Sequence, residues 1–176
     1  MSGKNQPGQP EPWLRATLSD VPVVARAAIH ALQLAKEDLH RWVSPLTEVE
    51  LNDRPSGLPS VAFHMRHIAG SLDRLLTYAE NRQLTPHQIE FLKSELDSAG
   101  HPGSRFADFD GALEQSETRI RTLAHADLNE TRNVGGKKLP TTIGSLLVHV
   151  ADHTQRHVGQ AITTAKILLF NRTAKH

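Results

Sequence analysis

Residues 145–169 read SLLVHVADHTQRHVGQAITTAKILL, a stretch that contains no proline and has apolar residues recurring every three or four positions. This spacing is typical of an amphipathic α-helix. Thr141 and Thr142 stand just before it, and threonine is a residue type that favours the N-cap of a helix. The sequence therefore predicts a long last helix that starts at one of these threonines and runs to about Leu169.

The same apolar spacing predicts three more long helices upstream, over residues 20–44, 61–84 and 106–128. Ser60 is expected to cap the helix over 61–84. A shorter connecting helix is expected over 85–100, and residues 47–50, TEVE, have the form of a capping box. Residues 133–140, NVGGKKLP, predict a turn or a short hairpin-like connection. No segment alternates for long enough to indicate a strand.

These elements predict an all-α protein, an antiparallel four-helix bundle with a short connecting helix. Residues 1–18 are expected to form a flexible N-terminal arm, because the first dozen are rich in Pro, Gly, Gln and Ser. Residues 19–170 are expected to form the bundle domain, and residues 171–176 a C-terminal tail.

Composition narrows the classes of function. The chain has 176 residues and a formal net charge of +1, and it has no dense run of Lys and Arg, so nucleic acid is not an expected partner. The sequence has neither the roughly 18 continuous apolar residues of a membrane span nor a secretory signal, so we expect a soluble cytoplasmic protein. Cysteine is absent, so any metal must be bound by nitrogen and oxygen.

Three of the 11 histidines, His149, His153 and His157, stand four residues apart in the last helix. At 100° per residue they project at roughly 0°, 40° and 80°, so they form one stripe along the border of the apolar face. Gln160 lies within this stripe. Two imidazoles at i and i+4 can bind one metal ion, so this stripe is a candidate metal site.

A further ligand must come from another helix, and HMRH in the second long helix offers His64 and His67. The helical projection by itself favours His64, which lies within the apolar arc, whereas His67 lies off its edge. In the alternative interpretation these histidines are hydrogen-bonded core residues. Several neutral imidazoles buried together each need a partner, however, so their spacing favours a metal ion over core packing.

Two kinds of metal site lack residues that they require. Thr154 occupies the position of the general-base Glu in an H-E-x-x-H metalloprotease helix. Ferritin-like di-iron bundles need two Glu-x-x-His motifs, and residues 37–40, EDLH, are the only such motif here. A mononuclear site fits the sequence better.

The segments VAFHMRHIAGSLDRLL, 61–76, and LLVHVADHTQRHVGQ, 146–160, resemble the DinB/YfiT-like superfamily of four-helix-bundle metalloenzymes, and the resemblance covers most of residues 20–169. It implies that His67, His153 and His157 bind a divalent ion such as zinc or nickel, with water completing the shell. His64 and His149 would then be supporting residues or alternative ligands, and Gln160 would orient a ligand or a water molecule.

The resemblance also implies a range of functions. Members of the superfamily include thiol S-transferases that use bacillithiol and isomerases that use mycothiol, so an external low-molecular-weight thiol is an expected cosubstrate beside a small-molecule substrate. A hydrolase using metal-bound water would need the same site. Family members often pair through helices, which makes a homodimer an expectation. The competing hypothesis is a non-catalytic helical bundle, structural or interacting, with a degenerate or purely structural histidine cluster and no stoichiometric metal.

Overall fold

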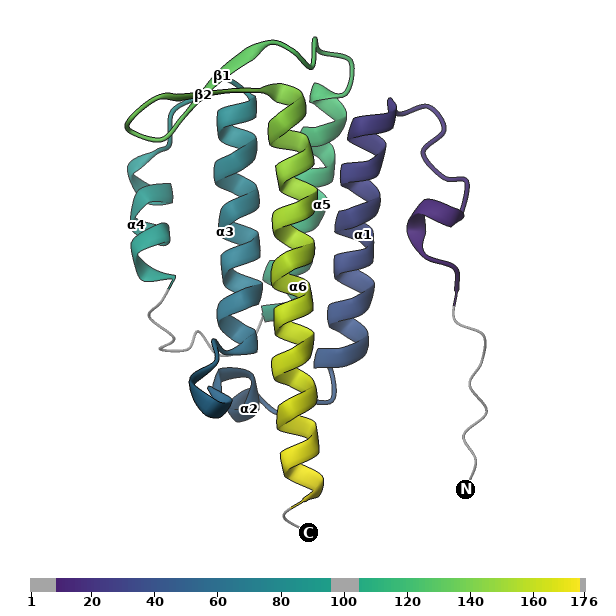
Figure 1. Cartoon of the computed structure of the whole chain (residues 1–176), viewed down its shortest axis with the longest axis vertical. Helices are drawn as coiled ribbons and strands as arrows, with labels where there is room; N and C mark the ends of the chain where they lie inside the picture. Colours follow the sequence, from purple (N-terminus) through teal and green to yellow (C-terminus); the bar gives the residue numbers. More distant parts are fainter. Residues whose placement is uncertain (1–8, 96–104, 175–176) are drawn as a thin grey trace.

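The computed structural model describes residues 9–95 and 105–174 and is predominantly helical (Figure 1). Its elements, with η for a short 3₁₀ helix, are η1 (Pro12–Leu14), α1 (Val23–Val43), α2 (Glu48–Asn52), η2 (Pro55–Gly57), α3 (Val61–Ala79), α4 (Pro86–Ser94), α5 (Arg105–Leu123), β1 (Thr131–Val134), β2 (Leu139–Thr142) and α6 (Ile143–Thr173). The expected all-α class is confirmed. In the described part of the chain, no helix is both long and apolar enough to cross a membrane.

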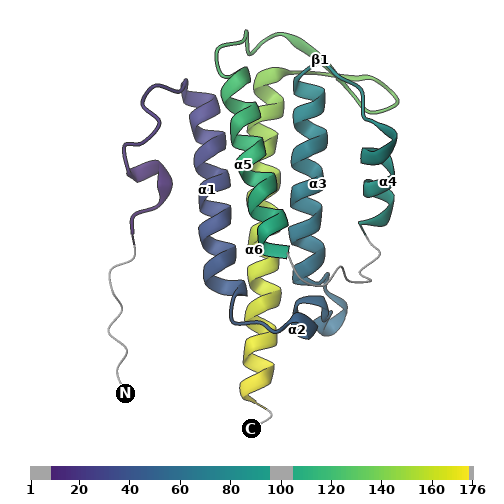
Figure 2. The ribbon, with the colours of Figure 1, turned by 180° about the vertical axis from the view of Figure 1, so that it is seen from behind.

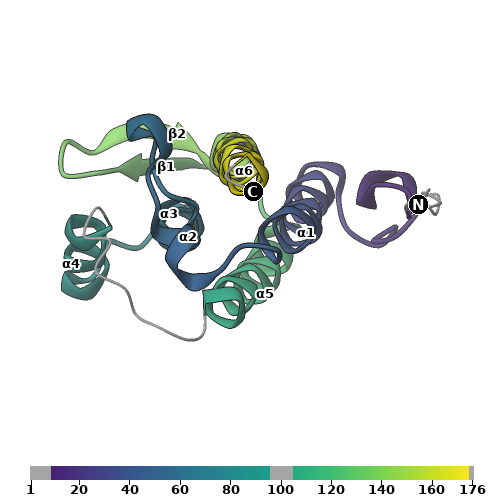
Figure 3. The same cartoon turned by 90° about the horizontal axis from the view of Figure 1, so that it is seen from below.

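Four helices, α1, α3, α5 and α6, lie side by side, and α5 and α6 each pack against both α1 and α3 (Figures 2 and 3). The pairs α1–α5 and α3–α6 run antiparallel, as expected, whereas α1–α6 and α3–α5 run parallel (Figure 1). The expected fully antiparallel order is corrected in this respect. The reason is the path after α3: α4 runs back along α3, so that α5 starts from the same end of the molecule as α3.

The interior between these helices is filled by aliphatic stripes that recur at helical spacing. Fully buried side chains include Ile29, Leu32 and Leu39 of α1, Ile68, Leu72 and Leu76 of α3, Phe109 and Ile120 of α5, and Leu147 of α6. Burial of such a side chain contributes about 1.5–3 kcal/mol, so the four stripes together position α3 against α6. The histidines lie at the interface between α3 and α6, which we call the seam.

Several helix boundaries differ from the sequence expectation. The first helix begins at Val23, because Pro22 is the N-cap residue. The helix α3 ends at Ala79 rather than at residue 84, and the chain turns at Asn81, whose φ of 59° lies in the left-handed region that asparagine tolerates. The expected end of the connecting helix, after Glu95, lies outside the described residues. The helix α5 ends at Leu123, five residues short of the expected end.

The last helix continues through Thr173, beyond the expected end near Leu169 and into the expected C-terminal tail. Arg172 accounts for the extension, because its Nε donates to Glu50 Oε1 at 2.8 Å and its guanidinium also donates to the Pro45 carbonyl at 3.0 Å. These bonds attach the last turn of α6 to α2 and to the connection between α1 and α2.

The hairpin-like connection before α6 is a true β-hairpin. The strands β1 and β2 pair antiparallel, with Thr131 opposite Thr142 and Val134 opposite Leu139. Each strand has four residues, too few for an alternating pattern to stand out in the sequence. The turn uses Gly135 at a φ of 72°, where a glycine is favoured.

Thr142 ends this hairpin and caps α6, since its hydroxyl accepts the Ser145 amide at 3.1 Å. Replacement by alanine leaves that amide without its cap, so Thr142→Ala is expected to lower the free energy of unfolding by about 1 kcal/mol in urea denaturation. The control is Thr163→Ala, whose hydroxyl only donates to the Gly159 carbonyl within α6 and whose loss is expected to change stability by less than about 0.5 kcal/mol. Equal effects of the two substitutions would contradict the capping role.

Candidate metal centre

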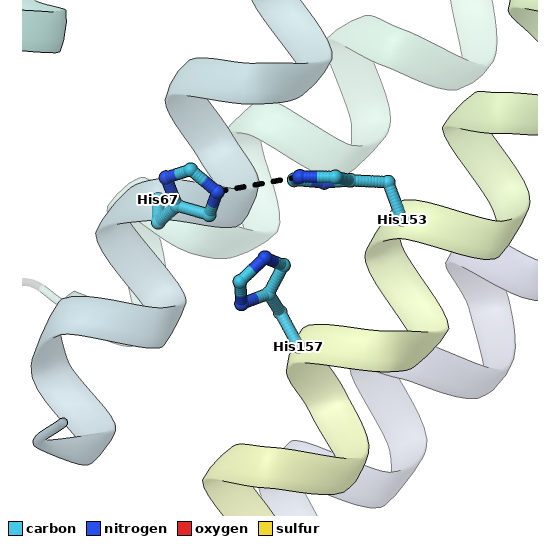
Figure 4. Close-up of side chains that lie close together, drawn as sticks. All are labelled: His67, His153 and His157. Atoms are coloured by element: carbon cyan, nitrogen blue, oxygen red, sulfur yellow. Dashed lines mark hydrogen bonds between the residues drawn. The ribbon is translucent and has the colours of Figure 1, made fainter. Parts of the chain in front are cut away.

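Three histidines meet at the seam between α3 and α6. His67 extends from α3, and His153 and His157 extend from successive turns of α6 toward it (Figure 4). One ring nitrogen from each lies within 4.8 Å of the other two. The ring centroid of His157 lies 4.4 Å from that of His67 and 4.6 Å from that of His153, so each ring touches both others. The i,i+4 spacing on α6 produces this convergence.

The spacing of the nitrogens fits a metal ion. His67 Nε2 and His153 Nε2 are 3.3 Å apart (Figure 4). Two imidazole nitrogens bound at 2.0–2.1 Å to one tetrahedral zinc lie about 3.3 Å apart. His157 completes the group, with one ring nitrogen within 4.8 Å of a nitrogen of each of the other two rings. Three nitrogens with neither thiolate nor carboxylate form a donor set that suits zinc or nickel.

The surroundings of His153 and His157 keep these two imidazoles neutral and able to donate lone pairs. Burial, followed by repulsion from His157 and His67, lowers the pKa of His153 to about 4. Burial also lowers the pKa of His157, with a further contribution from His67 and from Arg156. Both imidazoles are therefore uncharged at neutral pH, which is the protonation state that binds a cation.

A buried ion pair between Arg74 and Glu95 contacts His67 at Nδ1. His67 Nδ1 is 2.7 Å from Glu95 Oε2, and Arg74 donates to Glu95 Oε1 at 2.5 Å. Burial alone would raise the pKa of Glu95, but the hydrogen bonds from His67 and Arg74 outweigh it and hold the pKa below its usual value. Sequence reasoning did not find Glu95, because it follows α4, in a segment with no motif and no periodicity that points to the histidines.

The other histidines singled out in the sequence lie outside this trio. His64 is 1% exposed; its Nδ1 is 3.1 Å from His157 Nδ1, and its Nε2 has no hydrogen-bond partner among the described residues. His149 is half-exposed, with its ring 5.4 Å from that of His153. Gln160 is exposed on α6. The structure thus brings His67, and not His64, next to both His153 and His157.

A small pocket adjoins the cluster. It has a volume of about 220 Å³, and its wall is formed by Ser71, Arg74, Leu75, Tyr78, Leu84, Leu92, His149 and His153. One of the three converging histidines therefore also faces the pocket. The pocket is open to solvent, and its wall combines apolar with polar side chains.

These features define a helical protein with a candidate mononuclear histidine metal centre beside a small pocket. A family model described as the DinB superfamily matches residues 31–161, a span that includes His67, His153 and His157. The chain belongs to the DinB superfamily, and the resemblance inferred from the sequence is confirmed. No curated protein and no solved structure matches the chain.

Proposed function

We propose that this protein is a divalent-metal-dependent enzyme whose mononuclear site is formed by His67, His153 and His157. The observation that supports it best is the 3.3 Å separation of His67 Nε2 and His153 Nε2, since it matches the spacing of two ligands on one zinc ion. Zinc and nickel are the proposed ions. Three protein ligands leave a coordination position for water or a substrate.

The proposed reaction is either transfer of an external thiol to an electrophile or hydrolysis by metal-bound water. A bound divalent ion supplies Lewis acidity, which ionises a thiol or a water molecule that reaches it. Because the chain has no cysteine, the thiol has to come from a separate low-molecular-weight molecule. The pocket of about 220 Å³ beside His153 supports a small-molecule substrate.

The chain's own residues have two roles in this proposal. The three imidazoles bind the ion as uncharged ligands, so that the site keeps the positive charge that attracts a thiolate or hydroxide. Leu75 and Tyr78 give the pocket an apolar wall that excludes water from part of the substrate. Arg74, on the wall of the pocket, is 8% exposed and is paired with Glu95.

Metal content tests the proposal directly. Tag-free protein purified without chelator is expected to contain about one zinc or nickel ion per chain by plasma mass spectrometry. We expect His67→Ala, His153→Ala and His157→Ala each to lose it, because two remaining imidazoles hold an ion weakly. The matched control is His125→Ala, which removes an exposed histidine outside the trio and should leave the metal content unchanged.

His64→Leu distinguishes the two candidate ligands of the second long helix, since it should retain the ion if His67 is the ligand. A wild-type protein that takes up no metal even after reconstitution would overturn the enzyme proposal. The competing hypothesis of a non-catalytic bundle with a structural histidine cluster would then stand.

A further inference from the structure

We propose that Glu95 is a positioning residue for this metal centre: its carboxylate holds the proton of His67 on Nδ1 and so directs the bare Nε2 toward His153 and His157. The inference rests on the proposed function, because it assigns a role in metal binding. Glu95 contacts His67 at Nδ1, the ring nitrogen that does not face His153, and is not itself a proposed ligand of the ion.

The hydrogen bonds of Glu95 determine which nitrogen of His67 carries the proton. A histidine ring without external constraint can carry its single proton on either nitrogen. Arg74, which is always charged, donates to Glu95 Oε1 at 2.5 Å, and His67 Nδ1 lies 2.7 Å from the other oxygen, Oε2. A carboxylate only accepts hydrogen bonds. The proton between Glu95 and His67 is therefore on Nδ1.

The position of this proton determines the direction of the free lone pair of His67. With its proton on Nδ1, a neutral His67 has its lone pair on Nε2, the nitrogen that lies 3.3 Å from His153 Nε2. The Ser71 hydroxyl is 3.4 Å from the same atom and accepts from Arg74 Nη2 at 3.2 Å. Glu95 and Arg74 therefore fix both the tautomer and the surroundings of the nitrogen that is proposed to bind the ion.

The helix α3 leaves space for the Arg74–Glu95 ion pair at Gly70. A Cβ atom on Gly70, in the middle of α3, would lie 2.5 Å from Glu95 Oε1, 2.6 Å from Phe91 and 2.8 Å from Arg74 Nη1. Glycine is a poor residue for a helix interior, so its presence here matches a need for close approach. Glu95 itself is 4% exposed, which strengthens its bond to His67 by excluding water.

Outer partners of this kind orient a metal-binding histidine and raise its basicity, and their loss usually weakens metal affinity by about 10- to 100-fold. Glu95→Gln is the first test variant, because it keeps the size of the side chain and removes its charge. Gly70→Ala is the second, because it displaces Glu95 and Arg74 without removing either. The matched control is Glu80→Gln, since Glu80 pairs with Arg119 at 2.6 Å beside the end of α3, away from the histidines.

Two measurements are made on the full chain. Zinc affinity is determined by competition with a chromophoric chelator, and the tautomer of His67 in metal-free protein is read from long-range ¹H–¹⁵N NMR spectra. We expect Nδ1–H in the wild type, a smaller Nδ1–H population in Glu95→Gln and Gly70→Ala, and a Kd for zinc raised about 10- to 100-fold in both. Glu80→Gln should lower thermal stability and leave the Kd and the tautomer unchanged.

The outcomes separate the two proposals. Wild-type zinc affinity and tautomer in both test variants would overturn the positioning role and leave the metal site standing. The same loss of affinity in Glu80→Gln would also overturn it, because the effect would then be one of general stability. Absence of zinc binding by the wild-type protein would overturn the proposed function, and with it the role of Glu95, whichever tautomer His67 adopts.

Discussion

Zinc is expected to stabilise the wild-type protein by about 4 kcal/mol when free zinc exceeds its Kd a thousandfold, because an ion that binds only the folded state shifts the equilibrium by mass action. The proposed ligands justify that assumption: His67 and His153 are 86 residues apart in the chain and meet only when α3 packs against α6. For a chain of this length the midpoint should rise by roughly 8–16 °C. Calorimetric scans with zinc and with chelator measure the difference.

The histidine variants show where the ion binds. His67→Ala and His153→Ala should unfold at the same temperature with zinc and with chelator, whereas His125→Ala should keep the wild-type increase. An undiminished increase in His153→Ala would mean that zinc binds elsewhere, among the remaining histidines of a chain that has 11. A wild type without any increase would contradict the proposed site itself.

The helices could be predicted because their signals are local. Ser60 caps α3 by accepting the Phe63 amide at 3.2 Å, and Thr85 and Gln88 form the capping box of α4, as their residue types indicate. The end of α3 was predicted less well. Leu84, at the expected end, continues the apolar spacing but lies after the turn at Asn81, and periodicity alone does not register such a change of backbone direction.

The directions of the helices could not be derived in the same way. Apolar stripes show that α1, α3, α5 and α6 bury one side, but not which neighbour covers it. The parallel α1–α6 pair brings together distant segments, as in the hydrogen bond from Gln155 of α6 to the Ala31 carbonyl of α1 at 2.7 Å. Short connections favour antiparallel neighbours. The connection from α3 to α5 is longer, because α4 returns the chain to the end of the molecule where α3 starts, and α5 therefore runs parallel to α3.

In the candidate site, too, the sequence predicts the geometry within one helix but not the packing between helices. The spacing of His153 and His157 is a property of one helix, so the sequence predicts that they converge. The choice between His64 and His67 depends on how α3 rotates against α6: periodicity selects the more buried residue, His64, whereas the seam brings His67 to the cluster. Glu95 reaches His67 through tertiary packing alone, which no local pattern encodes.

Acid is expected to destabilise the metal-free protein over the range from about pH 6.5 down to about pH 4. An unfolded histidine titrates near pH 6.5, whereas burial, aided by repulsion from His157 and His67, lowers the pKa of His64 in the folded protein to about 4. Between these values the unfolded chain binds more protons, so the free energy of unfolding decreases as the pH falls. His64 alone should account for about 3 kcal/mol, and His153, whose pKa is also about 4, steepens the decrease.

Urea denaturation in chelator at several pH values between 7 and 4 compares the wild type with His64→Leu. The variant cannot take up the proton, so it should lose about 3 kcal/mol less than the wild type over this range. At pH 7 the substitution removes a buried Nε2 without a hydrogen-bond partner among the described residues, but it also removes the contact of His64 Nδ1 with His157 Nδ1 at 3.1 Å. The comparison therefore uses the change in stability with pH in each protein. The control His125→Ala should follow the wild type, since His125 is exposed. Equal acid sensitivity in His64→Leu and the wild type would contradict the assignment, because the proton uptake that drives unfolding would then have to occur at His153 and His157.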